Sequence, residues 1–255
     1  MASEPVDLPA QDVAAVVHRA FPGAVPAADY IAWTVAACAE HGMTPEVTLP
    51  ILVTCRDEVL TDFKAFVSSS WGLTFSGSSL GGSFTMGRTG LDAARRHIPE
   101  TELPLRVAFF VFPHVGIDAD GVIGNIQRQG RANTSLACGA IITMREQFLS
   151  GEVRLEFDPT DPEMSLLRQR IAPHLLGRPV PDLVTITELV REAAVDDLVA
   201  TGITTGGPIG DLAVFTGLLV NGPNETSWVW PNAATVHRQH EAVSIDLDIA
   251  QMRDF

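Results

Sequence analysis

Cysteine and histidine residues at three positions could together bind a metal ion. Cys55 ends one apolar stretch, His114 follows another, and Cys138 opens a helical pattern after a glycine-rich segment. A helix N-terminus lowers the pKa of a thiol and favours the thiolate. Two cysteines and one histidine form a full protein ligand set for a catalytic zinc, with the fourth position left for water. The residues alone also allow a simpler interpretation, two buried cysteines and a hydrogen-bonded histidine, and the long spacing leaves both open.

A second candidate for chemistry is a serine nucleophile at Ser79. Residues 77–81 (GSSLG) match the G-x-S-x-G pattern of serine hydrolases. That pattern requires a strand immediately before it and a helix immediately after it. Here Gly82 and Ser83 follow, and the next helical pattern begins only at Leu91. A serine hydrolase is therefore the less favoured function.

Other catalytic motifs are missing from the sequence. There is no G-x-G-x-x-G or G-x-x-x-x-G-K-[ST] segment, so neither a dinucleotide fingerprint nor a P-loop is present. The H-x-E motif of zinc deaminases is also missing, because Val115 and Gly116 follow His114.

Short apolar runs alternate with helical patterns along the chain. The runs predict strands over residues 48–55, 105–112, 212–220, 226–230 and 242–248. Helical spacing predicts helices over residues 12–20, 26–41, 58–67, 91–97, 137–149, 163–176 and 182–198. Glycine-rich residues 71–89 and 116–131 are expected to form loops. This order predicts an α/β fold with a mostly parallel central sheet flanked by helices and antiparallel C-terminal strands, in a single domain over residues 1–255.

Composition limits which partners the protein is expected to bind and which cellular compartment it is expected to occupy. The formal net charge of −14 disfavours nucleic acid and an anionic membrane surface as partners. No apolar run is long enough to span a membrane, and no secretory signal is visible at the N-terminus. Three cysteines are too few for a disulfide framework, and Cys38 is expected to be a small buried hydrophobe. These features favour the cytoplasm.

Six ordered motifs resemble a known family. They are FPGA at 21–24, DY at 29–30, CRDE at 55–58, GRTG at 87–90, PHVGID at 113–118 and ACGA at 137–140. In this combination the sequence resembles the low-CO2-inducible protein B/C family, whose active members are called theta-type carbonic anhydrases. The resemblance spans about residues 20–145.

The resemblance implies a fold, a cofactor and an activity. The implied fold is that of the beta-class carbonic anhydrases, usually as a homodimer, with a zinc ion held by Cys55, His114 and Cys138. The implied activity is the reversible hydration of CO2 to bicarbonate by a zinc-bound hydroxide. Some members of the family bind zinc without hydratase activity, so the alternative is an inactive zinc protein that handles CO2 or bicarbonate, or serves as a scaffold.

The resemblance also implies a catalytic aspartate, Asp57, two residues after the first cysteine. From the residues alone, Asp57 is equally suited to cap the helix expected from residue 58. In the beta class the aspartate pairs with an arginine two residues further on, a position that Val59 occupies here. The candidates for that arginine are Arg56, which points to the opposite face of a regular strand, and Arg88, which a glycine-rich loop would allow to reach inward.

Overall fold

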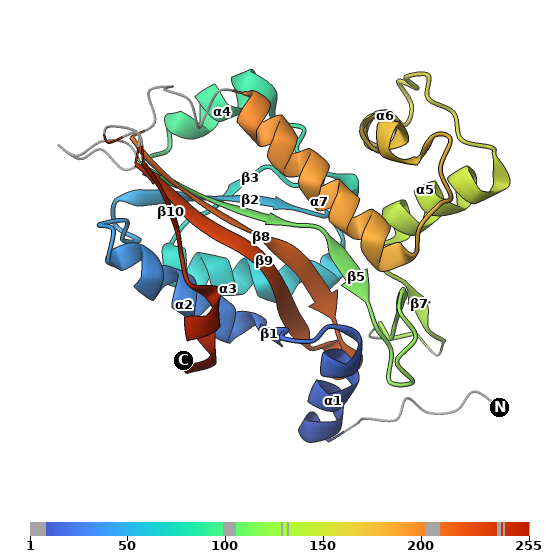
Figure 1. Ribbon diagram of the computed structural model, residues 1–255, viewed down its shortest axis with the longest axis horizontal. Coiled ribbons are helices and arrows are strands. Elements are labelled where there is room, and N and C mark those ends of the chain that lie inside the picture. Colours follow the sequence, from blue (N-terminus) through green and yellow to red (C-terminus); the bar gives the residue numbers. More distant parts are fainter. Residues whose placement is uncertain are drawn as a thin grey trace.

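The chain folds around an eight-stranded sheet. The computed structural model describes residues 9–98, 106–128, 130–131, 133–201, 210–238, 241 and 243–254 (Figure 1). The strands of this sheet are β1 (Val25–Pro26), β2 (Thr48–Thr54), β3 (Phe75–Ser76), β4 (Arg106–Phe112), β5 (His114–Gly116), β8 (Asp211–Asn221), β9 (Ser227–Arg238) and β10 (Val243–Asp246). A separate small hairpin pairs β6 (Asn125–Ile126) with β7 (Ser135–Leu136).

The sheet is parallel at its centre and antiparallel toward the C-terminal strands. Its main order is β1-β9-β8-β4-β2-β3, with β10 beside β9 and β5 beside β8. Strands β3, β2, β4 and β8 run parallel, and β5 runs parallel to β8. Strand β9 is antiparallel to β8, and β1 and β10 are antiparallel to β9. The predicted α/β fold with antiparallel C-terminal strands is therefore confirmed.

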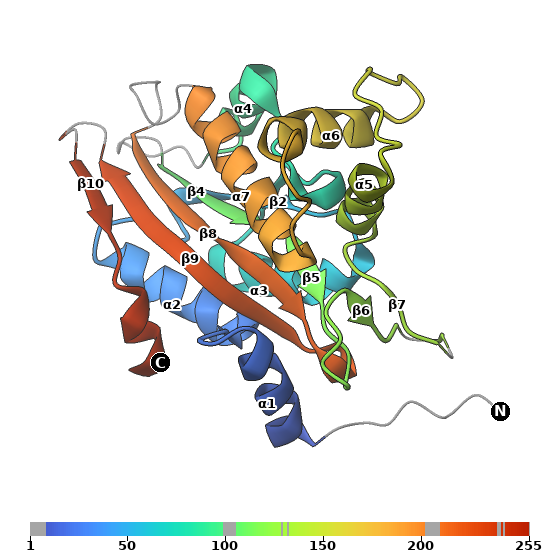
Figure 2. The same ribbon diagram turned by 45° about the vertical axis from the view of Figure 1, so that its right-hand side comes forward.

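Helices cover both faces of the sheet. The α-helices are α1 (Ala10–Ala20), α2 (Ala27–Ala39), α3 (Thr61–Trp71), α4 (Gly87–Arg95), α5 (Gly139–Ser150), α6 (Pro162–Leu175) and α7 (Leu183–Ala200). Short 3-10 turns are η1 (Glu58–Leu60), η2 (Leu80–Gly82), η3 (Pro223–Glu225) and η4 (Ile249–Asp254). Helices α2 and α3 lie on one face, and α4 and α7 lie on the other, with α5 and α6 next to α7 (Figures 1 and 2).

Alternate side chains of the central strands enter two cores. Leu52 and Phe110 join Trp71 of α3 in one cluster, whereas Val53 packs with Leu91 of α4 in another. Every residue of β2 is buried, because both faces of the sheet are covered. This double burial explains why the strands are continuous apolar runs without an alternating polar pattern.

Some predicted boundaries differ from those of the structure. Strand β9 runs to Arg238, far beyond the predicted end at residue 230, because its pairing with β8 continues past Pro231 through a register shift between Thr216 and Gly217. The segment 71–89 is not all loop, since it contains β3 and the start of α4. Leu105 and Ala242, the predicted first residues of two strands, lie outside the described residues. In the part of the chain that the structure describes, no helix has the length and apolar character needed to cross a membrane.

Candidate metal centre

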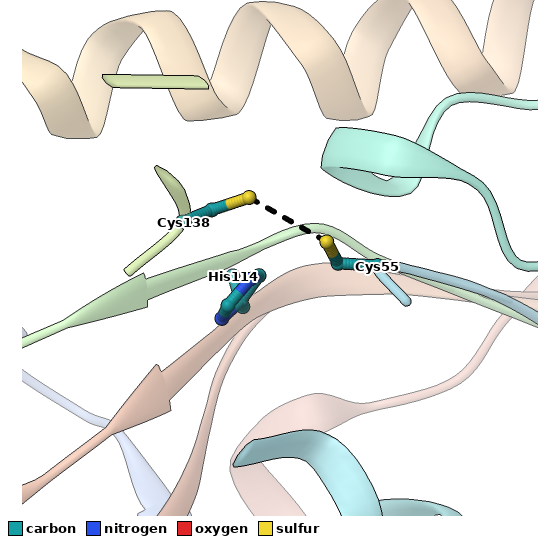
Figure 3. A group of neighbouring side chains, drawn as sticks. All are labelled: Cys55, His114 and Cys138. Atoms are coloured by element: carbon teal, nitrogen blue, oxygen red, sulfur yellow. Dashed lines mark hydrogen bonds between the residues drawn. The ribbon is translucent and has the colours of Figure 1, made fainter. Parts of the chain in front are cut away.

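The fold brings Cys55, His114 and Cys138 together at the carboxyl-terminal ends of the central strands. Cys55 directly follows β2, His114 opens β5 just after β4, and Cys138 immediately precedes α5. In open α/β sheets, sites lie just beyond these carboxyl ends. Figure 3 shows the two sulfur atoms pointing toward one another beside the imidazole ring.

The geometry of the three side chains suits a metal ion. The Sγ atoms of Cys55 and Cys138 are 3.5 Å apart, and all three ligand atoms lie within 4.8 Å of one another. Two sulfurs bound to one tetrahedral zinc at about 2.3 Å would lie about 3.8 Å apart. The Nε2 atom of His114 is buried without a hydrogen-bond partner among the described residues. A buried nitrogen left without a partner is costly, and a metal ion would satisfy it.

The two thiols are inequivalent. The pKa of Cys138 is lowered, because its sulfur accepts a hydrogen bond from Cys55 and further ones from backbone N–H groups at the start of α5. The pKa of Cys55 is raised by that shared hydrogen bond and by burial. The fold therefore favours deprotonation of Cys138, first through the hydrogen bond with Cys55 and then through the N–H groups at the start of α5.

Backbone contacts fix Cys138 against the His114 strand. The N–H of Gly116 donates to the carbonyl of Ala137 at 2.9 Å, and the N–H of Ala137 donates to the carbonyl of Gly124 at 3.0 Å. A Cβ atom at Gly116 would lie 2.6 Å from the carbonyl oxygen of Asn125. Glycine at this position therefore allows β5, which carries His114, to approach the backbone of β6 at Asn125.

Asp57 is paired with Arg128. Nη2 of Arg128 donates to Oδ1 and Oδ2 of Asp57 at 2.9 and 2.8 Å. Arg128 also donates through Nε to Glu58 at 2.6 Å, and through Nη1 to Ser135 Oγ at 2.7 Å and the Leu136 carbonyl at 2.8 Å. The guanidinium thus joins the aspartate to the β6–β7 hairpin.

The pair sets the charge and the orientation of Asp57. Burial acts to raise the pKa of Asp57, but hydrogen bonds, among them those from Arg128 and the N–H of Val59, outweigh burial and hold the pKa below its ordinary value. Oδ2 of Asp57 lies 3.8 Å from Nε2 of His114. An ionised carboxylate therefore stands next to the metal-binding position while its oxygens are held by Arg128. Asp57 also accepts a hydrogen bond from the N–H of Val59, so it caps the η1 turn as expected.

Neither arginine expected from the sequence pairs with Asp57. Arg56 points away and forms an ion pair with Glu163 of α6 at 2.6 Å, with 60% of its side chain exposed. Burial acts to raise the pKa of Glu163, but hydrogen bonds from Arg56 and the Leu80 N–H hold it below its ordinary value. Arg88 is exposed in the first turn of α4. The prediction that one of these two is the partner of Asp57 is corrected to Arg128, because its guanidinium takes both carboxylate oxygens.

Sequence reasoning missed Arg128 and Asn221. Arg128 lies in a glycine-rich segment predicted to be a loop, and its position between two ligand residues was the available signal. Asn221 lies one residue beyond the strand predicted over residues 212–220, yet it ends β8 and its Oδ1 lies 2.8 Å from Nδ1 of His114. Both residues depend on contacts between distant segments, which local patterns do not report.

Ser79 lacks the setting of a nucleophile. Its side chain is fully buried, and Oγ donates a hydrogen bond to the carbonyl of Ser83. The hydrogen bonds found in the described ranges include none between Ser79 and a histidine. These contacts give Ser79 a structural role in the turn that contains η2.

A cavity of about 720 Å³ is lined by residues that contact the candidate site. Arg128 and Asn221, which contact Asp57 and His114 respectively, both line it. Glu58, Asp62, Arg131 and Glu225 add charged groups to its wall. The cavity provides space for a small polar substrate next to the candidate site.

Comparison with known proteins assigns the family. The profile of the limiting CO2-inducible proteins B/C beta carbonic anhydrases matches residues 24–238. The chain belongs to this family. The predicted resemblance is thereby confirmed over a longer segment than the motifs covered.

Solved structures of the family share the fold. A crystal structure of PtLCIB4, a homolog of the limiting CO2-inducible protein LCIB, is 22% identical with a TM-score of 0.81, covering 92% of this chain and 99% of that one. A crystal structure of limiting CO2-inducible protein LCIB is 27% identical with a TM-score of 0.72, covering 91% and 96% respectively. A search of curated proteins gave no significant match.

Proposed function

We propose that this protein is a zinc-dependent carbonic anhydrase that interconverts CO2 and bicarbonate. The observation that carries the proposal is a buried Cys55, His114 and Cys138 cluster with an aspartate–arginine pair beside it. Membership of the beta carbonic anhydrase family supports the same activity. Two sulfurs and one imidazole nitrogen make zinc the best match among common metals and leave a fourth position open.

Zinc, when bound, supplies a nucleophilic oxygen from water at neutral pH. Asp57 and Arg128 then determine how that oxygen is oriented toward the substrate. Oδ2 of Asp57, 3.8 Å from Nε2 of His114, would accept a hydrogen bond from a water molecule held there and orient that water toward CO2. Arg128 keeps that carboxylate ionised and, by holding both oxygens, prevents it from taking the open metal position itself.

The pairing of Asp57 favours the active enzyme over an inactive zinc protein of the same family. Without an arginine partner, the carboxylate would be free to bind the metal and block it. Arg128 supplies the partner that Val59 cannot. The cavity lined by Arg128 and Asn221 gives CO2 and bicarbonate space beside the residues that hold Asp57 and His114.

We further propose a homodimer in the cytoplasm, with the chain folded as one domain. Three free cysteines suit a reducing compartment. Exposed apolar side chains at Val122 and Leu136, each 50% exposed near the hairpin, are the kind of surface that a second copy would cover. Light scattering should give twice the chain mass of 27.3 kDa, and a monomer mass across micromolar concentrations would contradict the dimer.

CO2 hydration followed with a pH indicator tests the activity. The protein is assayed as isolated, after removal of metal by a chelator, and after zinc is restored. We expect activity to disappear with the metal and to return with zinc. Cys38→Ser serves as the control, because Cys38 is a buried core residue outside the metal-binding cluster. A zinc-loaded protein that hydrates CO2 no faster than buffer would contradict the proposal.

A further inference from the structure

The side-chain amide of Asn221 lies between the metal-binding cluster and the turn that carries Asp57. Asn221 is the last residue of β8 and is 3% exposed. Its Oδ1 lies 2.8 Å from Nδ1 of His114, and its Nδ2 donates to the carbonyl of Val59 at 3.1 Å. Both polar ends of the amide are therefore occupied by protein groups.

The Val59 contact fixes which way the amide points. A backbone carbonyl only accepts hydrogen bonds, so the NH2 group of Asn221 must face Val59. Its oxygen must then face His114, and an oxygen acceptor requires that Nδ1 of His114 carries the ring proton. The neutral ring then has its lone pair on Nε2, the buried atom that has no hydrogen-bond partner in the described structure. The amide thus selects the tautomer that binds metal through Nε2.

The other end of the amide acts on Asp57. Val59, whose carbonyl accepts from Asn221, donates its own N–H to Oδ1 of Asp57 at 3.3 Å. The η1 turn is therefore tied to β8 through one side chain. Movement of Asn221 would displace both the imidazole and the carboxylate.

We propose that Asn221 is a positioning residue that sets the tautomer of His114 and holds the Asp57 turn in register with it. The role in catalysis rests on the proposed carbonic anhydrase function, whereas the tautomer is a property of the protein with or without metal. Hydrogen-bond partners of metal-bound histidines commonly change metal affinity by about 10- to 100-fold when they are removed.

Two substitutions separate the two ends of the amide. Asn221→Leu removes both contacts. Asn221→Asp keeps an acceptor for Nδ1–H of His114 and loses the donor to Val59. Thr216→Val is the matched control, because it removes another buried polar group from β8, away from the site. Zinc affinity is measured by competition with a chromogenic chelator, and the tautomer by ¹⁵N spectra of the histidine ring in the metal-free and zinc-loaded proteins.

We expect Asn221→Leu to weaken zinc binding by about 10- to 100-fold and to lose the Nδ1–H tautomer. Asn221→Asp should keep that tautomer and bind zinc more tightly than the leucine variant, but hydrate CO2 more slowly than the wild type. Thr216→Val should resemble the wild type in all measurements. Folded Asn221→Leu with wild-type zinc affinity and an unchanged tautomer would overturn the proposal.

The remaining outcomes separate the positioning role of Asn221 from the proposed carbonic anhydrase activity. If Asn221→Leu does not fold, the ring spectrum of Asn221→Asp takes its place, and a proton on Nε2 in that variant would refute the assigned role. If the wild type binds zinc and shows the Nδ1–H tautomer but does not hydrate CO2, the proposed function fails while the positioning role stands. If the metal-free wild type carries its ring proton on Nε2, the positioning role fails whatever the activity.

Discussion

Removal of the Arg128 guanidinium should impair CO2 hydration without removing the metal. The substitution Arg128→Met keeps an apolar stem of similar length and deletes the donor to both oxygens of Asp57. This substitution removes one of the groups that hold the pKa of Asp57 low, while burial still acts to raise it, so the pKa of Asp57 should rise. The freed side chain could also turn toward the open metal position.

The size of the effect follows from the contacts. Both hydrogen bonds to Asp57 leave from the same nitrogen, so we count them as one charge-assisted interaction of about 1.5–3 kcal/mol. At about 1.4 kcal/mol for each factor of ten, this predicts a loss of about 10- to 150-fold in turnover at full zinc occupancy. The contacts with Ser135 and Leu136 act on the hairpin and the contact with Glu58 acts on the η1 turn, so their loss lowers stability rather than turnover.

Stopped-flow hydration with a pH indicator, with zinc measured on the same sample, checks this prediction. Arg56→Met is the matched control, because it deletes an arginine one residue from Asp57 whose ion pair is exposed. Exposed pairs contribute about 0.2–1 kcal/mol, so this control should remain close to wild type. If Arg128→Met turned over as fast as Arg56→Met at equal zinc content, the assigned role of Arg128 would be refuted.

Three further substitutions test the candidate site and the contacts that support it. Asp57→Asn should keep zinc, fold and the helix cap but lose a factor on the order of 10² in hydration, and wild-type turnover would show that Asp57 only caps the turn. Gly116→Ala should lower stability to urea by about 1–3 kcal/mol, because its Cβ would meet a backbone carbonyl at 2.6 Å, whereas Gly139→Ala meets nothing within 4 Å. Because the pKa of Glu163 is held low in the fold, its pair with Arg56 stabilises above about pH 4.3 and is lost as pH falls through the folded pKa. Glu163→Gln should therefore flatten the fall in urea midpoint below that pH, and an unchanged slope would count against it.

The candidate metal ligands were predictable because sheet topology brings them together. Once residues 48–55 and 105–112 were predicted to be parallel strands, Cys55 and His114 had to lie at the same edge. Cys138 was predicted from its place at the start of a helix, and the family resemblance added the catalytic role of Asp57. These positions depend on strand ends and on a helix start, which sequence patterns locate well.

The partners of those residues were not predictable from local patterns. Arg128 reaches Asp57 because the β6–β7 hairpin folds a glycine-rich segment back over the site, and a hairpin of two-residue strands leaves no periodic signal. Asn221 lies in a sequence typical of turns, although β8 continues to it. In both cases a polar side chain is placed by contacts between segments far apart in the sequence.

The central claim is that Cys55, His114 and Cys138 bind one zinc ion with a position left open. X-ray absorption at the zinc edge, combined with metal content per chain, tests it most directly. We expect about one zinc per chain with two sulfurs at about 2.3 Å and two nitrogen or oxygen ligands at about 2.0–2.1 Å. Cys55→Ser, His114→Ala and Cys138→Ser should each lose zinc, and Cys38→Ser should keep it. Full zinc occupancy in all three ligand variants, or a zinc shell without sulfur in the wild type, would contradict the account.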